Sequence, residues 1–159
     1  MCPYFNPILI ILILSDTMKL KSHIIITFGI SSILYLIYNS FGMFISSFIG
    51  GVLIDLDHLV DYYFHNGINF RVRRFFTWCY NLQWNKVIIL LHSLELIFAL
   101  WVVISVFNLG PLWLGLAIGI SQHLILDMLF NNETVNVFSY FFAFRCIKGF
   151  RKEYIIGRK

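Results

Sequence analysis

The chain has 159 residues, of which 59% are hydrophobic and 13% are charged, and its mean hydropathy is +0.80. These values exclude an ordinary soluble domain of this length and indicate a single membrane domain. The formal net charge of +4 does not indicate a nucleic-acid partner. Its basic residues stand at the ends of apolar runs, where they typically meet the anionic headgroups of membrane lipids.

Residues 1–17 form an N-terminal extension ahead of the first long apolar run. Their own apolar stretch, 7–14, is shorter than the roughly 18 residues that a membrane span needs. It also lacks the basic start and the small-residue cleavage site of a signal peptide. Met18, followed by Lys19 and Lys21, is a natural start for a first membrane helix, so the sequence leaves both Met1 and Met18 open as the translation start.

Four long apolar segments follow, each close to the length that crosses a hydrocarbon core of about 30 Å. They cover residues 20–38, 41–63, 86–107 and 111–130. Uncharged breaks rich in turn formers separate the first pair and the last pair, which favours two tight helical hairpins. Small residues recur every four positions in the second and fourth segments, and this spacing predicts close packing of these two helices.

The twelve Lys and Arg residues lie before the first span, in the central loop and its edge, and in the tail. Because cytoplasmic loops collect Lys and Arg, we expect both termini on the cytoplasmic side of the cell (inner) membrane. The sequence thus predicts an all-α, polytopic membrane helical bundle over residues 18–134, with about four transmembrane helices. Residues 135–159, aromatic and then basic, are expected to form an amphipathic helix lying at the inner interface.

Ionisable side chains occur in all four predicted spans, where each is costly and therefore a functional candidate. They are His23, Asp55, Asp57, His58, Asp61, His92, Glu95, His123 and Asp127. No Lys or Arg lies in the interior of the spans, since Lys21 and Lys86 stand at their ends, so a bound cation would supply the charge that these carboxylates lack. Imidazole and carboxylate ligands without thiolate suit zinc, and also manganese or iron.

The predicted topology places these side chains in one layer near the cytoplasmic face, as a metal site inside a helix bundle requires. His123 and Asp127 stand four residues apart, and His92 and Glu95 three apart, so each pair shares a helix face. Read singly, His23 fits a helix-to-helix hydrogen bond equally well, and Asp61 fits a solvated helix end. Taken together, the set favours metal binding.

Three motifs carry a family resemblance. They are Asp55-Leu56-Asp57-His58 after Gly50-Gly51, then Leu91-His92-Ser93-Leu94-Glu95, then Gln122-His123 with Asp127. With His23, they resemble the membrane-bound metal-dependent hydrolase family of bacterial and archaeal membranes, which is distantly similar to zinc-dependent phospholipase C. The chain departs from the family at Ile54, where many members have Pro, and before His92, where many carry an additional His-Arg.

The resemblance implies a hydrolase, which we expect to cleave phosphoester bonds in a lipid-linked or membrane-proximal substrate at the cytoplasmic face. The expected metal ligands are His23, Asp57, His58, His92, His123 and Asp127. Asp55 or Glu95 would act as general base or orient a ligand, and Arg71, Arg73 and Arg74 could hold a phosphate. The alternative is a non-enzymatic, metal-stabilised membrane scaffold or regulator. A transporter ranks third, because the outer halves of the third and fourth spans offer almost no polar residues.

Overall fold

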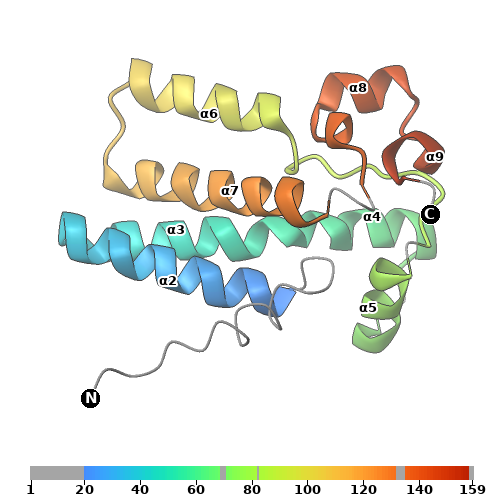
Figure 1. The fold of residues 1–159 in the computed structure, drawn as a ribbon, viewed down its shortest axis with the longest axis horizontal. Coiled ribbons are helices and arrows are strands. Elements are labelled where there is room, and N and C mark those ends of the chain that lie inside the picture. Colours follow the sequence, from blue (N-terminus) through green and yellow to red (C-terminus); the bar gives the residue numbers. More distant parts are fainter. Residues whose placement is uncertain (1–19, 69–70, 82, 132–134, 158–159) are drawn as a thin grey trace.

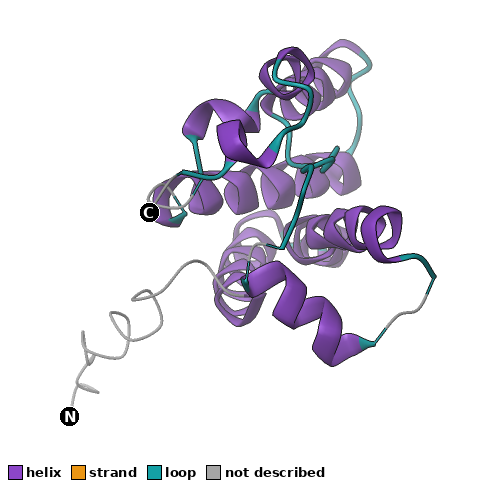
Figure 2. Ribbon diagram, turned by 90° about the vertical axis from the view of Figure 1, so that its right-hand side faces the viewer, coloured by secondary structure: helices purple, strands orange, loops and turns teal. Residues whose placement is uncertain are grey.

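The computed structural model describes residues 20–68, 71–81, 83–131 and 135–157, so the N-terminal extension and Met18 lie outside the described residues. The predicted all-helical class is confirmed, and Figure 2 shows helices and loops without a strand in the described part of the chain. The helices in chain order are α2 (Leu20–Tyr38), α3 (Phe41–Leu53), η1 (Ile54–Leu56), α4 (Asp57–Asn66), α5 (Val72–Tyr80), α6 (Leu94–Val106), α7 (Pro111–Phe130), η2 (Val137–Tyr140), α8 (Phe142–Ile147) and α9 (Lys152–Ile155).

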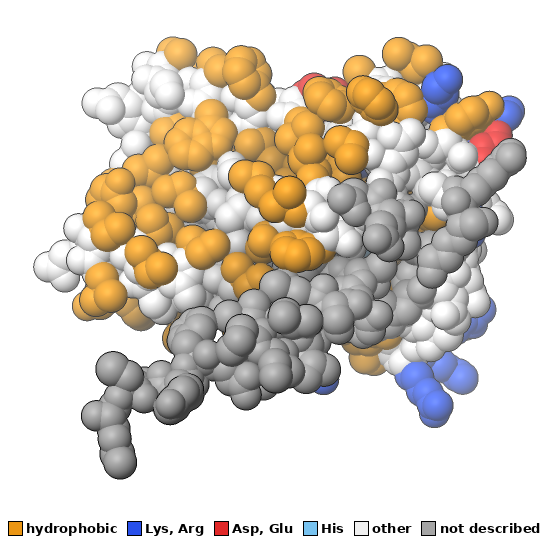
Figure 3. All heavy atoms as spheres, in the orientation of Figure 1, with side chains coloured by type: hydrophobic (Ala, Val, Ile, Leu, Met, Phe, Trp, Pro, Cys, Tyr) orange, Lys and Arg blue, Asp and Glu red, His pale blue; other side chains and the backbone are white. Residues whose placement is uncertain are grey.

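In the part of the chain that the structure describes, three helical stretches are long and apolar enough to cross a membrane: Leu20–Tyr38, Phe41–Asn66 and Pro111–Phe130. Hydrophobic side chains cover much of the surface that Figure 3 shows, while Lys and Arg gather at the end that carries α4, α5 and the C-terminal helices. The second stretch is continuous through the short 3-10 turn η1, as the long apolar run 41–63 predicts.

The third predicted span is helical only in its second part. α6 has 13 residues, which at 1.5 Å per residue gives a length of about 20 Å, short of a hydrocarbon core of about 30 Å. The preceding residues are extended because other parts of the chain satisfy their backbone groups. Val87 donates its N–H to the Phe150 carbonyl oxygen at 2.9 Å, and Leu91 donates its N–H to Asp57 Oδ2 at 3.0 Å. Irregular backbone of this kind is tolerated in an apolar setting only when it is paired in this way.

The bundle is built around close contact between α3 and α7, with α2 against α3 and α6 beside α7 (Figure 1). A Cβ atom added at Gly119 would collide with the Ser47 carbonyl oxygen, and one added at Gly50 would lie 2.8 Å from the Leu116 carbonyl oxygen. The small residues thus allow the two backbones to touch, as predicted for these spans.

The tail is not the single amphipathic helix that its composition suggested. Gly149 and Phe150 both have positive φ angles, 60° and 57°, which end α8 and turn the chain back toward α9. Gly adopts such angles freely, whereas Phe150 is held there by the surrounding contacts. The short helices η2, α8 and α9 fold onto the extended segment before α6. The central loop also contains a helix, α5, which was not predicted.

Candidate metal centre

Seven of the eight predicted site residues lie at one end of the bundle. His23 lies in the first turns of α2. The motif with Asp55, Asp57 and His58 lies in η1 and α4, and α7 contributes His123 and Asp127 from its last turns. His92 lies at a bend in the irregular segment just before α6. The two helices of each hairpin are antiparallel (Figure 1), so these positions meet although they are up to 104 residues apart in sequence.

The tightest group joins two imidazoles to two carboxylates. His123 Nε2 lies 3.3 Å from Asp127 Oδ2 and 3.4 Å from Asp55 Oδ1, and His92 Nε2 lies 3.5 Å from each of the same two oxygens. Ligand atoms bound about 2.0–2.1 Å from a tetrahedral ion stand about 3.3–3.4 Å apart. These four nitrogen–oxygen distances match the separation of two ligands on one ion, and the four side chains are here called the quartet.

Both histidines of the quartet are oriented through their other ring nitrogen. His123 Nδ1 lies 2.8 Å from the Gly51 carbonyl oxygen, and His92 Nδ1 lies 3.0 Å from Asp57 Oδ2. A proton on Nδ1 satisfies both contacts and leaves the Nε2 lone pair directed into the quartet. Neither Nε2 has a hydrogen-bond partner in the described part of the chain, although both are buried. Metal-binding histidines are held in this manner.

Among the described residues, three overlapping groups of side chains can hold a metal ion. They are His92 with His123 and Asp127, then Asp55 with His58 and His92, then His23 with Asp55 and His123, and within each group one ligand atom per residue lies within 4.8 Å of the others. The first group is fully buried, whereas about a quarter of the Asp55 and His58 side chains is exposed. The cluster thus has a buried side and a side that faces open space.

Three of the predicted carboxylates, Asp57, Asp55 and Glu95, have surroundings that the sequence did not predict. Asp57 belongs to none of the metal-holding groups found among the described residues, and it accepts hydrogen bonds from His92 and Leu91, which are contacts that can orient His92. Asp55, expected to be a base or an orienting group, belongs to two of these groups. Glu95 lies outside the cluster, because its carboxylate accepts the backbone N–H groups of Phe142 and Ala143 at the start of α8.

Asp61 is fully buried rather than solvated, and its Oδ1 lies 3.4 Å from His65 Nδ1. His23, for which two readings were open, stands 3.1 Å from Asp127 Oδ1 and stacks on the His123 ring with centroids 3.9 Å apart. It therefore both joins a helix-to-helix contact and belongs to one metal-holding group. The three arginines of the central loop, Arg71, Arg73 and Arg74, are exposed.

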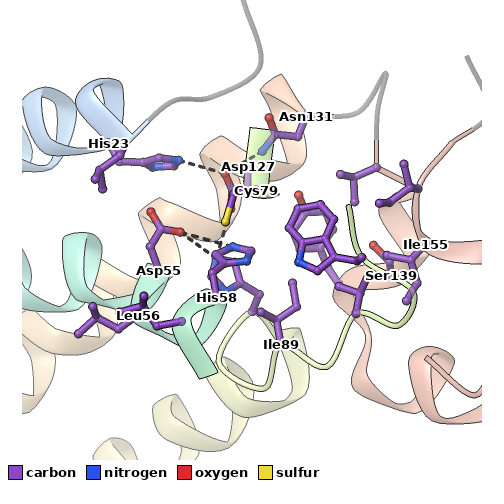
Figure 4. A pocket seen from close by; sticks show the side chains of 18 of the residues that line it. His23, Asp55, Leu56, His58, Cys79, Ile89, Asp127, Asn131, Ser139 and Ile155 are labelled. Atoms are coloured by element: carbon purple, nitrogen blue, oxygen red, sulfur yellow. Dashed lines mark hydrogen bonds and ion pairs between the residues drawn. The ribbon is translucent and has the colours of Figure 1, made fainter. Parts of the chain in front are cut away.

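A cavity of about 650 Å³ opens beside the cluster. In Figure 4, His23, Asp55, His58 and Asp127 lie on one side of it, and Ser139 and Ile155 lie on the other. Its apolar wall comes from a packed cluster that includes Phe75 and Val87. This volume is that of a typical small-molecule site, and a cavity next to buried polar groups is the usual form of a binding site.

One cavity residue was missed by the sequence analysis. Arg145 lines the cavity and is 1% exposed, and its burial lowers the pKa of the guanidinium. In the sequence it is simply the first of several basic residues after an aromatic run, and nothing in that pattern distinguishes it from Lys148 or Arg151.

Comparisons with protein-family models, with curated proteins and with solved structures find no match to this chain. The resemblance to metal-dependent hydrolases therefore remains a prediction carried by the three motifs. What the structure defines is a class: an all-helical protein with membrane-length helices and a buried cluster of His and Asp side chains able to hold a metal ion.

Proposed function

We propose that this protein is a membrane-embedded, metal-dependent hydrolase of phosphoester bonds, acting on a lipid-linked or membrane-proximal substrate at the cytoplasmic face. The observation that carries the proposal is the buried group of His92, His123 and Asp127, whose two Nε2 atoms lack hydrogen-bond partners in the described chain. The cavity beside it gives a substrate room to reach the same atoms. The membrane-length helices favour a substrate that is itself held in the membrane.

Zinc is the proposed ion, because imidazole and carboxylate groups are among its preferred ligands, although manganese and iron accept similar sets. The buried group of His92, His123 and Asp127 supplies three protein ligands, the number found in catalytic zinc sites. A divalent ion held there would polarise a phosphoryl oxygen and lower the pKa of a water molecule.

The chain's own residues would handle the proton. Asp55 and His58 lie on the cavity side of the cluster, and His58 Nε2 is 3.8 Å from Asp55 Oδ1. We infer that this pair accepts the proton of the attacking water, with Asp55 stabilising the imidazolium of His58 once it is protonated. Asp57 and the Gly51 carbonyl oxygen fix the two buried rings, so the ligands need little reorganisation when substrate binds.

The test has two stages. In the first, the metal content of purified protein in lipid nanodiscs is measured for the wild type, for the double variant His123→Ala/Asp127→Ala, and for His65→Ala. His65 is a matched control because it lies outside the three metal-holding groups. We expect metal in the wild type and the control and its loss in the double variant. Wild-type protein without bound metal would refute the proposed centre.

In the second stage, the same proteins are mixed with vesicles containing phosphatidic acid or phosphatidylglycerol, and released products are identified by mass spectrometry. We expect metal-dependent hydrolysis by the wild type and by His65→Ala, and none by the double variant. Metal binding without hydrolysis of phosphoesters would instead favour the metal-stabilised scaffold. The cavity that touches the cluster argues against that alternative, since structural metal sites are closed by protein ligands.

A further inference from the structure

Arg145 is a buried cation that forms no ion pair within the described part of the chain, although the charges of Asp57 and Glu95 act on it from a greater distance. Its NH2 group donates to the His92 carbonyl oxygen at 3.0 Å, its NH1 group donates to the Ile89 carbonyl oxygen, and its Cζ lies 5.7 Å from the Phe142 ring centroid. Its Nε has no hydrogen-bond partner, and no carboxylate lies within 4.0 Å of the guanidinium in the described part of the chain. Burying a charge that has no ion-paired partner is costly, so an anionic ligand in contact with the guanidinium would be stabilised there.

Arg145 lies where it can bind an anionic group beside the metal-holding cluster. It lines the cavity that the metal cluster also lines, and it is hydrogen-bonded to the backbone of His92, whose ring is part of the quartet. The cluster contains three carboxylates, Asp55, Asp57 and Asp127, so one divalent ion would leave it with one net negative charge. An anionic substrate therefore needs a further positive group near the cluster, and Arg145 can bind phosphate oxygens in a forked geometry.

The opposite part of the cavity is apolar. Phe75, Val87 and Ile155 are buried members of one packed cluster, and Leu59 and Phe76 pack against it. All five also line the cavity, together with the half-buried Cys79. A ligand that contacts both ends of this space must combine an anionic head with an apolar chain.

We propose that the cavity binds a phosphate-headed amphiphile, with Arg145 holding the phosphate at the metal cluster and the chain lying against the apolar wall. This proposal names the substrate class of the proposed hydrolase. It rests on the proposed function only for the reaction, because binding of the amphiphile can be tested without hydrolysis. It moves the phosphate-binding role from the exposed Arg71, Arg73 and Arg74 to a residue of the tail.

Cys79 provides a reporter for binding that does not depend on activity. Because burial raises the pKa of this thiol to about 12, its alkylation by N-ethylmaleimide will be slow enough to follow by peptide mass spectrometry. The probes are dodecyl phosphate, dodecanol and inorganic phosphate, added to full-length protein in phosphatidylcholine nanodiscs. Dodecyl phosphate has both the phosphate head and the apolar chain. Dodecanol has the chain without the phosphate, and inorganic phosphate has no chain.

In the wild type we expect dodecyl phosphate to halve the rate of Cys79 alkylation at a concentration about tenfold or more below dodecanol, the discrimination expected of a charged hydrogen bond. Inorganic phosphate should protect only weakly. Arg145→Gln should reduce the preference for dodecyl phosphate over dodecanol to about twofold or less, and Arg145→Lys should retain part of it, because Lys keeps the charge and loses the fork. The matched control is Arg151→Gln, which removes one charge from an exposed side chain of the same tail.

The proposal is overturned if Arg145→Gln keeps the wild-type preference, if Arg151→Gln loses it equally, or if dodecanol protects as well as dodecyl phosphate. Equal protection by inorganic phosphate would overturn the amphiphile and point to a free phosphate as ligand. If Arg145→Gln does not fold, Arg145→Lys and the wild-type ranking of the probes still decide. Metal content measured on the same samples separates a failure here from a failure of the metal centre.

Discussion

Replacing Asp57 by Asn should weaken metal binding without abolishing it. Asp57 Oδ2 accepts two hydrogen bonds of 3.0 Å, one from His92 Nδ1 and one from the Leu91 N–H. The Asn side chain keeps one oxygen for these donors but loses the negative charge that fixes the His92 proton on Nδ1. The lone pair of His92 Nε2 is then held less firmly toward the ion.

The expected loss of metal affinity in Asp57→Asn can be taken from other metalloproteins with histidine ligands. Loss of a group that orients a metal-bound histidine lowers metal affinity about 10- to 100-fold, or about 1.4–2.7 kcal/mol. The matched variant is Asp127→Asn, which removes a ligand of the buried group and should reduce bound metal far more. The two variants make the same chemical change at carboxylates on opposite sides of the His92 ring.

The assay is competition between the purified proteins and a zinc chelator of known affinity, read as the free zinc concentration at half occupancy. Asp57→Asn should retain the wild-type stoichiometry at saturating zinc, with the half-point raised by the stated factor. If Asp57→Asn and Asp127→Asn lose metal equally, Asp57 is a direct ligand, as the sequence suggested, and the orienting role is wrong.

Two further predictions concern residues outside the quartet. Glu95→Gln should leave metal content unchanged but increase protease cleavage within residues 135–157, because Glu95 holds the backbone of Phe142 and Ala143 rather than the ion. A loss of metal in this variant would restore Glu95 to the site. Gly119→Ala should lower the free energy of unfolding by about 1–3 kcal/mol in a detergent titration, since its methyl group meets the Ser47 carbonyl oxygen. Gly29→Ala should leave the free energy of unfolding unchanged, because nothing lies within 4 Å of the added Cβ. An equal loss of stability in the two variants would contradict this account of helix packing.

Much of the bundle follows from the length of the apolar runs and from helical spacing. The hairpin breaks near Asn39 and Asn108 lie where turn formers predict them, and both of these residues have the positive φ angles of tight turns. Because α2, α3 and α7 are regular helices, a residue's place in the run fixes its depth. The predicted topology therefore placed His23, His123 and Asp127 at the same end of the bundle, where the structure has them.

The distinction between ligand and orienting carboxylate could not be predicted in the same way. Asp55 and Asp57 belong to one motif, two residues apart, and either can be a ligand on an ideal helix. The 3-10 turn η1, Ile54–Leu56, changes the rotation per residue at this point. In the resulting geometry Asp55 reaches both Nε2 atoms of the quartet, and Asp57 reaches His92 Nδ1 from the other side.

The extended residues before α6 explain why the tail could not be assigned from its own sequence. Hydropathy alone predicts a helix through 86–93, because a short apolar run gives no sign of its backbone conformation. That segment is extended only because Phe150 and Arg145 of the tail, together with Asp57, satisfy its backbone groups. The same contacts set the position of His92 and carry Arg145 to the cavity wall. A tail whose composition suggests a surface helix is therefore bound, through hydrogen bonds to backbone groups, to the segment that carries His92, and amino-acid composition does not encode these bonds.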